Sequence, residues 1–206
     1  TGKNGVGRVI ARPFSGEPGN FKRTNQRHDF SLEPTGITML DILKKENYDS
    51  LAIGKIVDIF AGRGVTDYVR TQDNADGINK TIEWMKCDFG GLLFVNLVDT
   101  DMIYGHRNDV DGYADALSAF DARLPEIVAN LRKDDILMIT ADHGCDPSTP
   151  STDHSREDVP LLLYGSSVES GENYGTIDGF DCISASILSY LGTSQRTPGR
   201  DLFTIL

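Results

Sequence analysis

The sequence predicts an α/β fold with a mostly parallel sheet. After about residue 34, short apolar runs typical of buried strands alternate with longer segments whose apolar residues recur at helical spacing. Such alternation is typical of βαβ units, in which a helix connects two parallel strands. Open sheets of this kind bind ligands beyond the carboxyl ends of their strands. Acidic and histidine residues that follow the strands are therefore the first candidates for chemistry.

The first 30 residues differ in composition from the rest of the chain. They carry six basic and two acidic side chains, although the whole chain has a net charge of −11. Residues 6–11 alternate weakly and predict a strand, and a loop rich in Gly and Pro follows at 13–20. The character changes near 33–36, so we expect a small N-terminal part at 1–33 and a core at 34–206. The basic part suits an anionic substrate; the alternative is a solvated basic hairpin.

The core is expected to contain four helices and four strands. Thr38, with Asp41 three residues later, is an N-cap signature, and Pro160 fits the start of a strand. The longest helix contains Pro125, where we expect a bend, and Gly192 ends the last helix. In chain order the expected elements are a helix at 39–43, a strand at 51–53, a helix at 78–85, a strand at 92–98, a helix at 110–131, strands at 136–139 and 159–164, and a helix at 180–191.

Composition argues against several classes of protein. No apolar run is long enough to span a bilayer, and no charged segment followed by an apolar one opens the sequence. The negative charge argues against non-specific nucleic-acid binding. Three widely spaced cysteines argue against a disulfide framework or a thiolate zinc site. We therefore expect a cytoplasmic protein with no membrane or nucleic-acid partner.

Carboxylate and imidazole side chains follow two of the expected strands. Asp101 and His106 come after one strand, whereas Asp142, His143 and then His154 come after another. This set of oxygen and nitrogen ligands suits Mn²⁺, Zn²⁺ or Fe²⁺. One Asp-His-Gly sequence alone is a weak signal, because aspartate and glycine are ordinary turn residues. Together the five side chains exceed what one tetrahedral ion needs and predict two ions roughly 3.5–4 Å apart, which would hold a phosphoryl group.

Other polar residues near these strand ends have less specific roles. We expect Asp99, Asp146 and Asp153 to cap turns or orient ligands, and His28 to be structural or solvent-facing. A guanidinium binds phosphate with two hydrogen bonds and lysine acts as a point charge, so four residues are candidate phosphate contacts: Arg8, Arg23, Arg27 and Lys55. The alternative for Lys55 is an ordinary surface lysine.

Several motifs of the sequence together form a recognisable set. They lie at 96–101, 104–107, 140–144 and 152–157 in the core, and at 6–14, 16–21 and 27–29 in the N-terminal part. This set resembles the phosphopentomutases of the alkaline-phosphatase superfamily. The likeness covers essentially all 206 residues. The metal motifs alone also fit the related cofactor-independent phosphoglycerate mutases, whereas the arginine-rich N-terminal segment favours the pentose enzymes.

The resemblance implies a three-layer αβα alkaline-phosphatase-like core, here partial, and a remnant of an α+β cap domain at 1–33. It implies interconversion of ribose 1-phosphate, or 2-deoxyribose 1-phosphate, and the 5-phosphate in nucleoside salvage, with two Mn²⁺ ions and a sugar bisphosphate activator. One ion would take Asp101, His106 and His154, and the other Asp142 and His143. Arg8 and Lys55 would contact the phosphosugar.

The phosphothreonine nucleophile of this family, and one further metal-binding aspartate, have no counterpart in this sequence. We therefore expect the chain to be a C-terminal half that contains no catalytic nucleophile, needs the N-terminal half as its partner and is inactive alone. Two alternatives remain: a metal-dependent phosphatase or phosphodiesterase in which water attacks, and a non-catalytic phosphosugar- or metal-binding module. Exposed sheet surface should cause self-association or low solubility.

Overall fold

The computed structural model describes residues 6–24 and 28–204, without the side chains of Arg23, His28, Asp29 and Thr204. In chain order the elements are β1 (Arg8–Ala11), β2 (Phe14–Ser15), β3 (Lys22–Arg23), β4 (His28–Ser31), α1 (Met39–Lys45), β5 (Asp49–Ile53), α2 (Ile56–Ile59), β6 (Asp67–Val69), α3 (Asn74–Met85), β7 (Gly91–Val95), the π-helical turn η2 (Thr100–Tyr104), the 3₁₀ turn η3 (Gly105–Arg107), α4 (Val110–Ala129), β8 (Ile136–Thr140), β9 (Leu161–Gly165), α5 (Asp181–Tyr190) and the 3₁₀ turn η4 (Leu202–Thr204).

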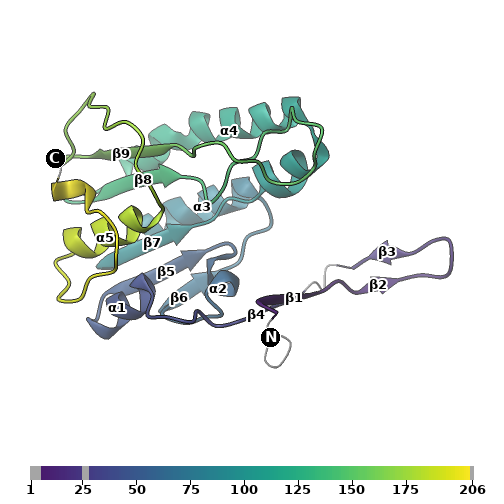
Figure 1. Cartoon of the computed structure of the whole chain (residues 1–206), viewed down its shortest axis with the longest axis horizontal. Coiled ribbons are helices and arrows are strands. Elements are labelled where there is room, and N and C mark those ends of the chain that lie inside the picture. Colours follow the sequence, from purple (N-terminus) through teal and green to yellow (C-terminus); the bar gives the residue numbers. More distant parts are fainter. Residues whose placement is uncertain (1–5, 25–27, 205–206) are drawn as a thin grey trace.

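Strands β1 to β4 form an arm that projects from the rest of the molecule (Figure 1). β1 pairs with β4 and β2 pairs with β3, both antiparallel. At the outer ladder the rings of Phe14 and Phe21 meet edge to face, with their centroids 5.0 Å apart. The strand expected at 6–11 is present as β1, but the other three strands were not expected. Their side chains do not alternate between apolar and polar, so pairing across the arm defines them.

The parallel sheet and its helices form three layers. β5 lies between β6 and β7 and is parallel to both. Leu92 and Phe94, two residues apart in β7, face the same side and both pack in a cluster with residues of α1 and α2. Leu92 also packs in a second cluster, which joins α1 to α5. Leu97, just beyond β7, packs on the other side with Ile78 of α3 and with α4. This αβα layering confirms the predicted fold class.

The expectation of parallel pairing is wrong for the last strand. β9 runs antiparallel to β8, with Ile136 opposite Gly165 and Thr140 opposite Leu161. A parallel return needs a crossover, usually through a helix, but residues 141–160 contain no helix and lead directly back beside β8. This long connection carries Asp142, His143 and His154, as functional loops often do.

The other expected elements are present with bounds shifted by a few residues, and Pro125 lies inside α4. Thr38 and Asp41 form the predicted capping box at the start of α1. The structure adds α2, β6, η2, η3 and η4, which are too short or too polar to give a periodic sequence signal. The division at residue 33 stays a prediction. None of the helices in the described ranges combines the length and apolar character that a membrane crossing requires.

Candidate metal centre

The carboxyl ends of β7 and β8 carry the expected polar residues. Beyond β7 the chain turns at Asp99, whose carboxylate accepts a hydrogen bond from the Asn74 backbone at 2.8 Å, while the Asn74 side chain accepts from the Asp99 backbone at 3.0 Å. Asp99 therefore fastens the strand end to the start of α3, as expected for a capping residue. The next residues form η2, and its π-helical turn presents Asp101; such turns frequently occur at functional sites.

Asp101, His106 and His154 lie together. Asp101 Oδ1 is 3.3 Å from His106 Nε2 and 3.2 Å from His154 Nε2. One ligand atom from each of the three residues lies within 4.8 Å of the other two. The structure therefore brings together residues from two segments almost 50 positions apart in the sequence.

Backbone carbonyls set the orientation of two imidazoles. His106 Nδ1 lies 2.6 Å from the Thr152 carbonyl oxygen, and His143 Nδ1 lies 3.0 Å from the Gly144 carbonyl oxygen. A carbonyl only accepts hydrogen bonds, so each Nδ1 carries the proton and donates it. In the neutral ring, Nε2 then holds the free lone pair, which is the form that binds a metal ion.

The environment of Asp101 Oδ1 fits a bound cation. This oxygen is buried and has no hydrogen-bond partner in the described part of the chain. It faces the Nε2 lone pair of His106, and two electron-rich atoms at that distance repel each other unless positive charge lies between or beside them. A divalent ion with oxygen and nitrogen ligands supplies that charge. The three side chains thus suit a metal such as Mn²⁺, Zn²⁺ or Fe²⁺.

Asp142 and His143 form a second, less complete group beside the first. The His143 ring stacks on the His154 ring with centroids 3.6 Å apart, and His143 Nε2 is 3.6 Å from Asp142 Oδ1. The Asp142 side chain is 72% exposed. The two groups are therefore adjacent, as a two-ion site requires, but the second contributes only two ligand side chains.

Residues 144–155 form a closed loop that returns His154 to His143. Gly144 and Ser155 pair at its base, with the Ser155 N–H donating to the Gly144 carbonyl at 3.1 Å. A Cβ on Gly144 would lie within 3 Å of the Glu157 and Ser155 backbones, so this position needs glycine. Inside the loop, the Ser148 hydroxyl and N–H donate to the Asp146 carboxylate, which lowers the pKa of Asp146. Asp146 is a turn-capping residue, as expected.

The close approach between Gly105 and Cys145 was not predicted from the sequence. A Cβ on Gly105 would lie 2.4 Å from Cys145 Sγ, so the η3 turn packs directly against the segment that follows β8. The contact joins the two halves of the Asp101, His106 and His154 group. Only an unexplained glycine beside a histidine could have suggested it.

Among the candidate phosphate contacts whose side chains the structure describes, Lys55 lies next to the candidate metal ligands. Lys55 follows β5, and its ammonium group contacts Met102 Sδ in η2, one residue after Asp101. It therefore lies at the same edge of the sheet as the metal candidates. Arg8 is on the arm, opposite Ser31. The Arg23 side chain and all of Arg27 lie outside the described residues, so the roles of these arginines stay predictions.

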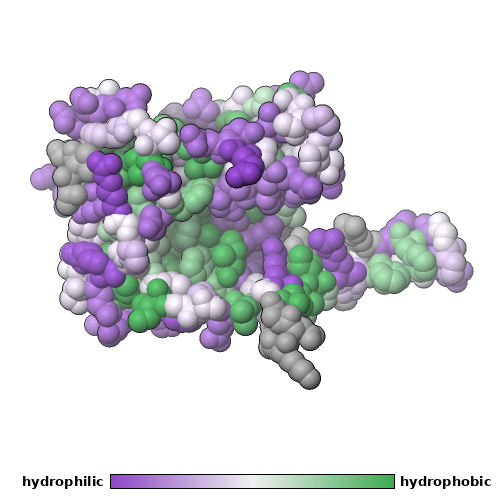
Figure 2. All heavy atoms as spheres, viewed as in Figure 1, coloured by the Kyte–Doolittle hydropathy of each residue, from purple (hydrophilic) through white to green (hydrophobic). Residues whose placement is uncertain are grey.

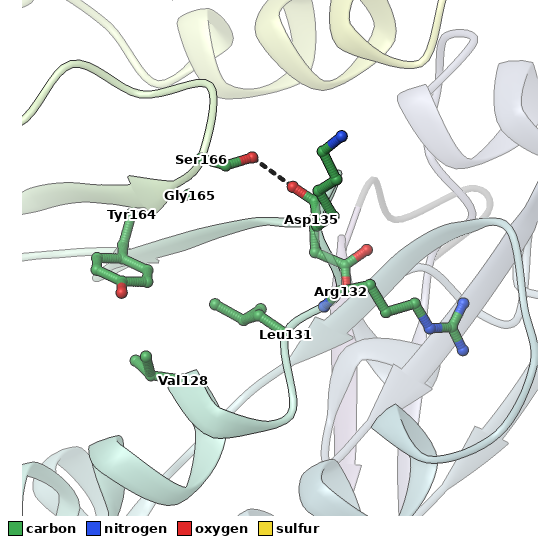
Figure 3. Close-up of a pocket in the computed structure, with 8 residues that line it drawn as sticks. Val128, Leu131, Arg132, Asp135, Tyr164, Gly165 and Ser166 are labelled. Atoms are coloured by element: carbon green, nitrogen blue, oxygen red, sulfur yellow. Dashed lines mark hydrogen bonds between the residues drawn. The ribbon is translucent and has the colours of Figure 1, made fainter.

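The pocket in Figure 3 belongs to the opposite end of β8. It has a volume of about 190 Å³ and is lined by residues at the end of α4, the start of β8 and the end of β9, including Leu131 and Tyr164. Ser166 closes one side by donating a hydrogen bond to the Lys133 carbonyl. Because the candidate ligands follow the other end of β8, this pocket plays no part in the metal centre.

Comparison with known proteins also indicates a metal-binding protein. A protein-family model described as the Metalloenzyme superfamily matches residues 17–195. This chain belongs to that superfamily. Membership and the Asp101, His106 and His154 group together imply metal binding.

Within the Metalloenzyme superfamily, the chain is similar to curated phosphopentomutases. The protein from Acetivibrio thermocellus is 59% identical over 199 residues, which are 97% of this chain and 51% of that protein. The protein from Carboxydothermus hydrogenoformans is 59% identical over 192 residues, or 93% of this chain and 50% of that protein. The chain therefore spans about half the length of the curated relatives it matches.

A solved structure supports the fold of this Metalloenzyme superfamily chain. The PH0037 protein from Pyrococcus horikoshii superposes with a TM-score of 0.59 at 18% sequence identity, covering 87% of this chain and 50% of that one. At this identity the match concerns the fold alone.

Proposed function

We propose that this chain is the metal-binding half of a phosphopentomutase that exchanges phosphate between the 1- and 5-positions of ribose or 2-deoxyribose in nucleoside salvage. The observation that carries the proposal is the buried Asp101 carboxylate oxygen facing Nε2 of His106 and His154. It occurs in a chain similar to curated phosphopentomutases over nearly its whole length. A cytoplasmic location is part of the proposal, supported by the free cysteines at 87, 145 and 182.

The chain would hold and orient two metal ions. Asp101, His106 and His154 would bind one Mn²⁺, and Asp142 with His143 would provide part of the shell of a second. When bound, such ions stabilise negative charge on the oxygens of a transferring phosphoryl group. The carbonyls of Thr152 and Gly144 keep the two imidazoles in the ligating form, since they accept the Nδ1 protons.

Basic side chains would bind the phosphosugar beside these ions. Lys55 is the best supported, because it contacts the η2 turn that carries Asp101. Arg8, Arg23 and Arg27 would reach the sugar phosphate from the arm. A sugar bisphosphate would restore the phosphorylated form of the whole protein.

We propose that the remaining half of the relatives' length supplies the nucleophilic threonine and the missing ligands. In the described ranges, β7 pairs only with β5 and β8 pairs only with β9, so each has an open edge for another strand. Figure 2 shows a hollow with apolar residues between the part that contains β8 and β9 and the part that contains β5 and α1. Both features favour a protein partner that completes the core.

Calorimetric titration of the purified chain with Mn²⁺, combined with an assay on ribose 5-phosphate, tests the proposal. We expect one ion to bind more tightly than the second, His154→Ala to weaken the tighter site, and no turnover by the isolated chain. Robust mutase activity from the chain alone would contradict the need for a second half.

Two results would instead support the alternative functions. Hydrolysis of an aryl phosphate that disappears in His154→Ala would favour a phosphatase. Binding of ribose 5-phosphate without any need for the rest of the protein would favour a binding module. Failure to bind Mn²⁺, Zn²⁺ or Co²⁺ would remove the metal centre itself.

A further inference from the structure

Asn108 lies at the junction between the two segments of the metal centre. It ends the η3 turn with a left-handed backbone, φ 54° and ψ 32°. Its side-chain amide donates hydrogen bonds to two carbonyls of the distant loop, those of Thr149 and Ser151, the latter at 3.1 Å. The loop is held to the η3 turn by these bonds and by the bond from His106 to Thr152.

The orientation of the Asn108 amide follows from its partners. Both acceptors are carbonyl oxygens, so Nδ2 must face them, and a reversed amide would place Oδ1 against two acceptors. In this orientation Oδ1 is buried and has no hydrogen-bond partner within the described residues. Asn108 Oδ1 therefore lies in an unfavourable environment, while Nδ2 holds the loop.

The bonds from Asn108 end three residues before His154. Between Asp146 and Asp153 the loop contains no helix or strand. Hydrogen bonds inside the loop, such as those from Ser148 to Asp146, do not determine where the loop lies relative to η3. Asp101 on η2 and His106 on η3 approach His154 from the other side. The distance between Asp101 and His154 thus depends on how firmly the loop is attached to the η3 turn.

We propose that Asn108 is a positioning residue for the metal centre, which clamps the 149–151 loop onto the turn that carries His106. This inference rests on the metal-binding role proposed above. Asn108 is not a ligand. It acts through the loop backbone, and it keeps His154 close enough to Asp101 for both to reach one ion.

The chain contains a matched control for backbone conformation. Asn47 is also left-handed, with φ 65°, and is exposed after α1, at the end of β5 remote from the metal candidates. Asparagine tolerates this conformation better than most residues, and glycine adopts it without cost. Replacing either asparagine with glycine removes the side chain and keeps the backbone, so only the Asn108 variant loses a clamp.

Hydrogen–deuterium exchange and metal titration on the 206-residue chain test the proposal. In the metal-free Asn108→Gly variant, amides at 149–154 should exchange faster than in wild type, whereas Asn47→Gly should leave them unchanged. Affinity for Co²⁺ or Mn²⁺ should fall about 10-fold in Asn108→Gly, as is usual when a residue that orients a ligand is lost, and stay at the wild-type level in Asn47→Gly. Co²⁺ absorption bands should shift in the first variant only.

Asn108→Asp provides a second variant, should the glycine chain fold poorly. It keeps the size and the tolerance of a left-handed backbone but presents an acceptor to the two carbonyls, so exchange at 149–154 should rise again. Wild-type exchange and wild-type metal affinity in folded Asn108 variants would overturn the proposal, as would an equal loss of affinity in Asn47→Gly. If wild type binds no metal, the proposed function fails, and the exchange experiment still decides whether the clamp exists.

Discussion

The chemistry of the candidate centre depends on single atoms whose partners are fixed by the fold. Asp101 Oδ1 is buried without a hydrogen-bond donor in the described part of the chain, and the imidazole of His106 is held by a carbonyl in the form that leaves Nε2 free. The Asp101 oxygen is costly to bury in a protein that binds no cation, because an unpaired carboxylate oxygen loses its hydration. At this scale the chain is organised for metal binding.

Asp101→Asn should abolish most of the stabilisation that metal provides. At Mn²⁺ concentrations about 100-fold above its dissociation constant, wild type gains roughly 2.7 kcal/mol of unfolding free energy, and the variant should gain little of it. Without metal the variant should be at least as stable as wild type, because a buried charge is removed. Thermal unfolding with and without Mn²⁺ checks both, with Asp121→Asn on the exposed surface of α4 as the control. Equal metal-induced shifts in the two variants would exclude Asp101 as a ligand.

Asp41 makes a pH-dependent contribution to stability at the start of α1. Partial burial raises its pKa, but hydrogen bonds from the Thr38 backbone and from Arg63 outweigh this and lower the pKa below its ordinary value of 3.8. The folded state therefore favours the charged form, and this stability is present above that value and lost as the pH falls through the lower folded pKa. Asp41→Asn should cost about 1–2 kcal/mol at pH 7 and pH 5, and less at pH 3.

Urea unfolding of wild type and Asp41→Asn at these three pH values measures the effect. A difference that stays constant down to pH 3 would show that the carboxylate charge plays no part.

Thr38→Ala, which removes the other half of the capping box, should cost about 1 kcal/mol of unfolding free energy, and Thr38→Ser should restore most of it.

At the scale of elements, the connection between β8 and β9 is what assembles the site. This connection is a closed loop and contains no crossover helix, so β9 pairs antiparallel with β8. The loop also brings His154 back to the carboxyl end of β8. The π-helical turn η2 likewise keeps Asp101 near the carboxyl end of β7. Two irregular segments position the ligands, one between β7 and α4 and the other between β8 and β9.

Gly144→Ala should disturb this loop at its base. The added methyl group would meet the backbone of Glu157 and Ser155, so the pairing of Gly144 with Ser155 must shift. We expect a loss of about 1–3 kcal/mol in unfolding free energy and weaker Mn²⁺ binding. Gly90→Ala is the control, since a Cβ there meets nothing within 4 Å. Wild-type metal affinity in Gly144→Ala would show that the loop base does not position His154.

At the scale of the whole molecule, apolar surface remains uncovered. Leu162, Tyr164 and Phe180 are each more than half exposed and line one large hollow of about 1090 Å³ that also reaches Asp142 and His143. We call these three side chains the β9 patch. Apolar surface of this kind next to candidate ligands favours coverage by another part of the whole protein.

The isolated chain should therefore self-associate. Light scattering after size-exclusion chromatography should give a mass above 22.6 kDa that rises with concentration, and Leu162→Ser with Tyr164→Ser should lower it. The matched control is Ile59→Ser with Tyr68→Ser, since these residues are similarly exposed outside the β9 patch. A monomer at every concentration, or an equal response to both pairs, would contradict a role for the patch.

The sequence by itself determined the local elements and the chemical type of the site. Thr38 and Asp41 predicted α1, and the apolar runs predicted β7 and β8. The five carboxylate and imidazole side chains that follow these strands predicted metal binding. Each of these signals depends only on residues that are neighbours in the sequence. Strands β2 to β4 of the arm, the antiparallel pairing of β9 and the contact of Gly105 with Cys145 depend on partners in other segments of the chain. Only the tertiary structure decided these features, together with the hydrogen bonds from Asn108 to Thr149 and Ser151, because packing and hydrogen bonds between distant segments leave no signal in either segment's own sequence.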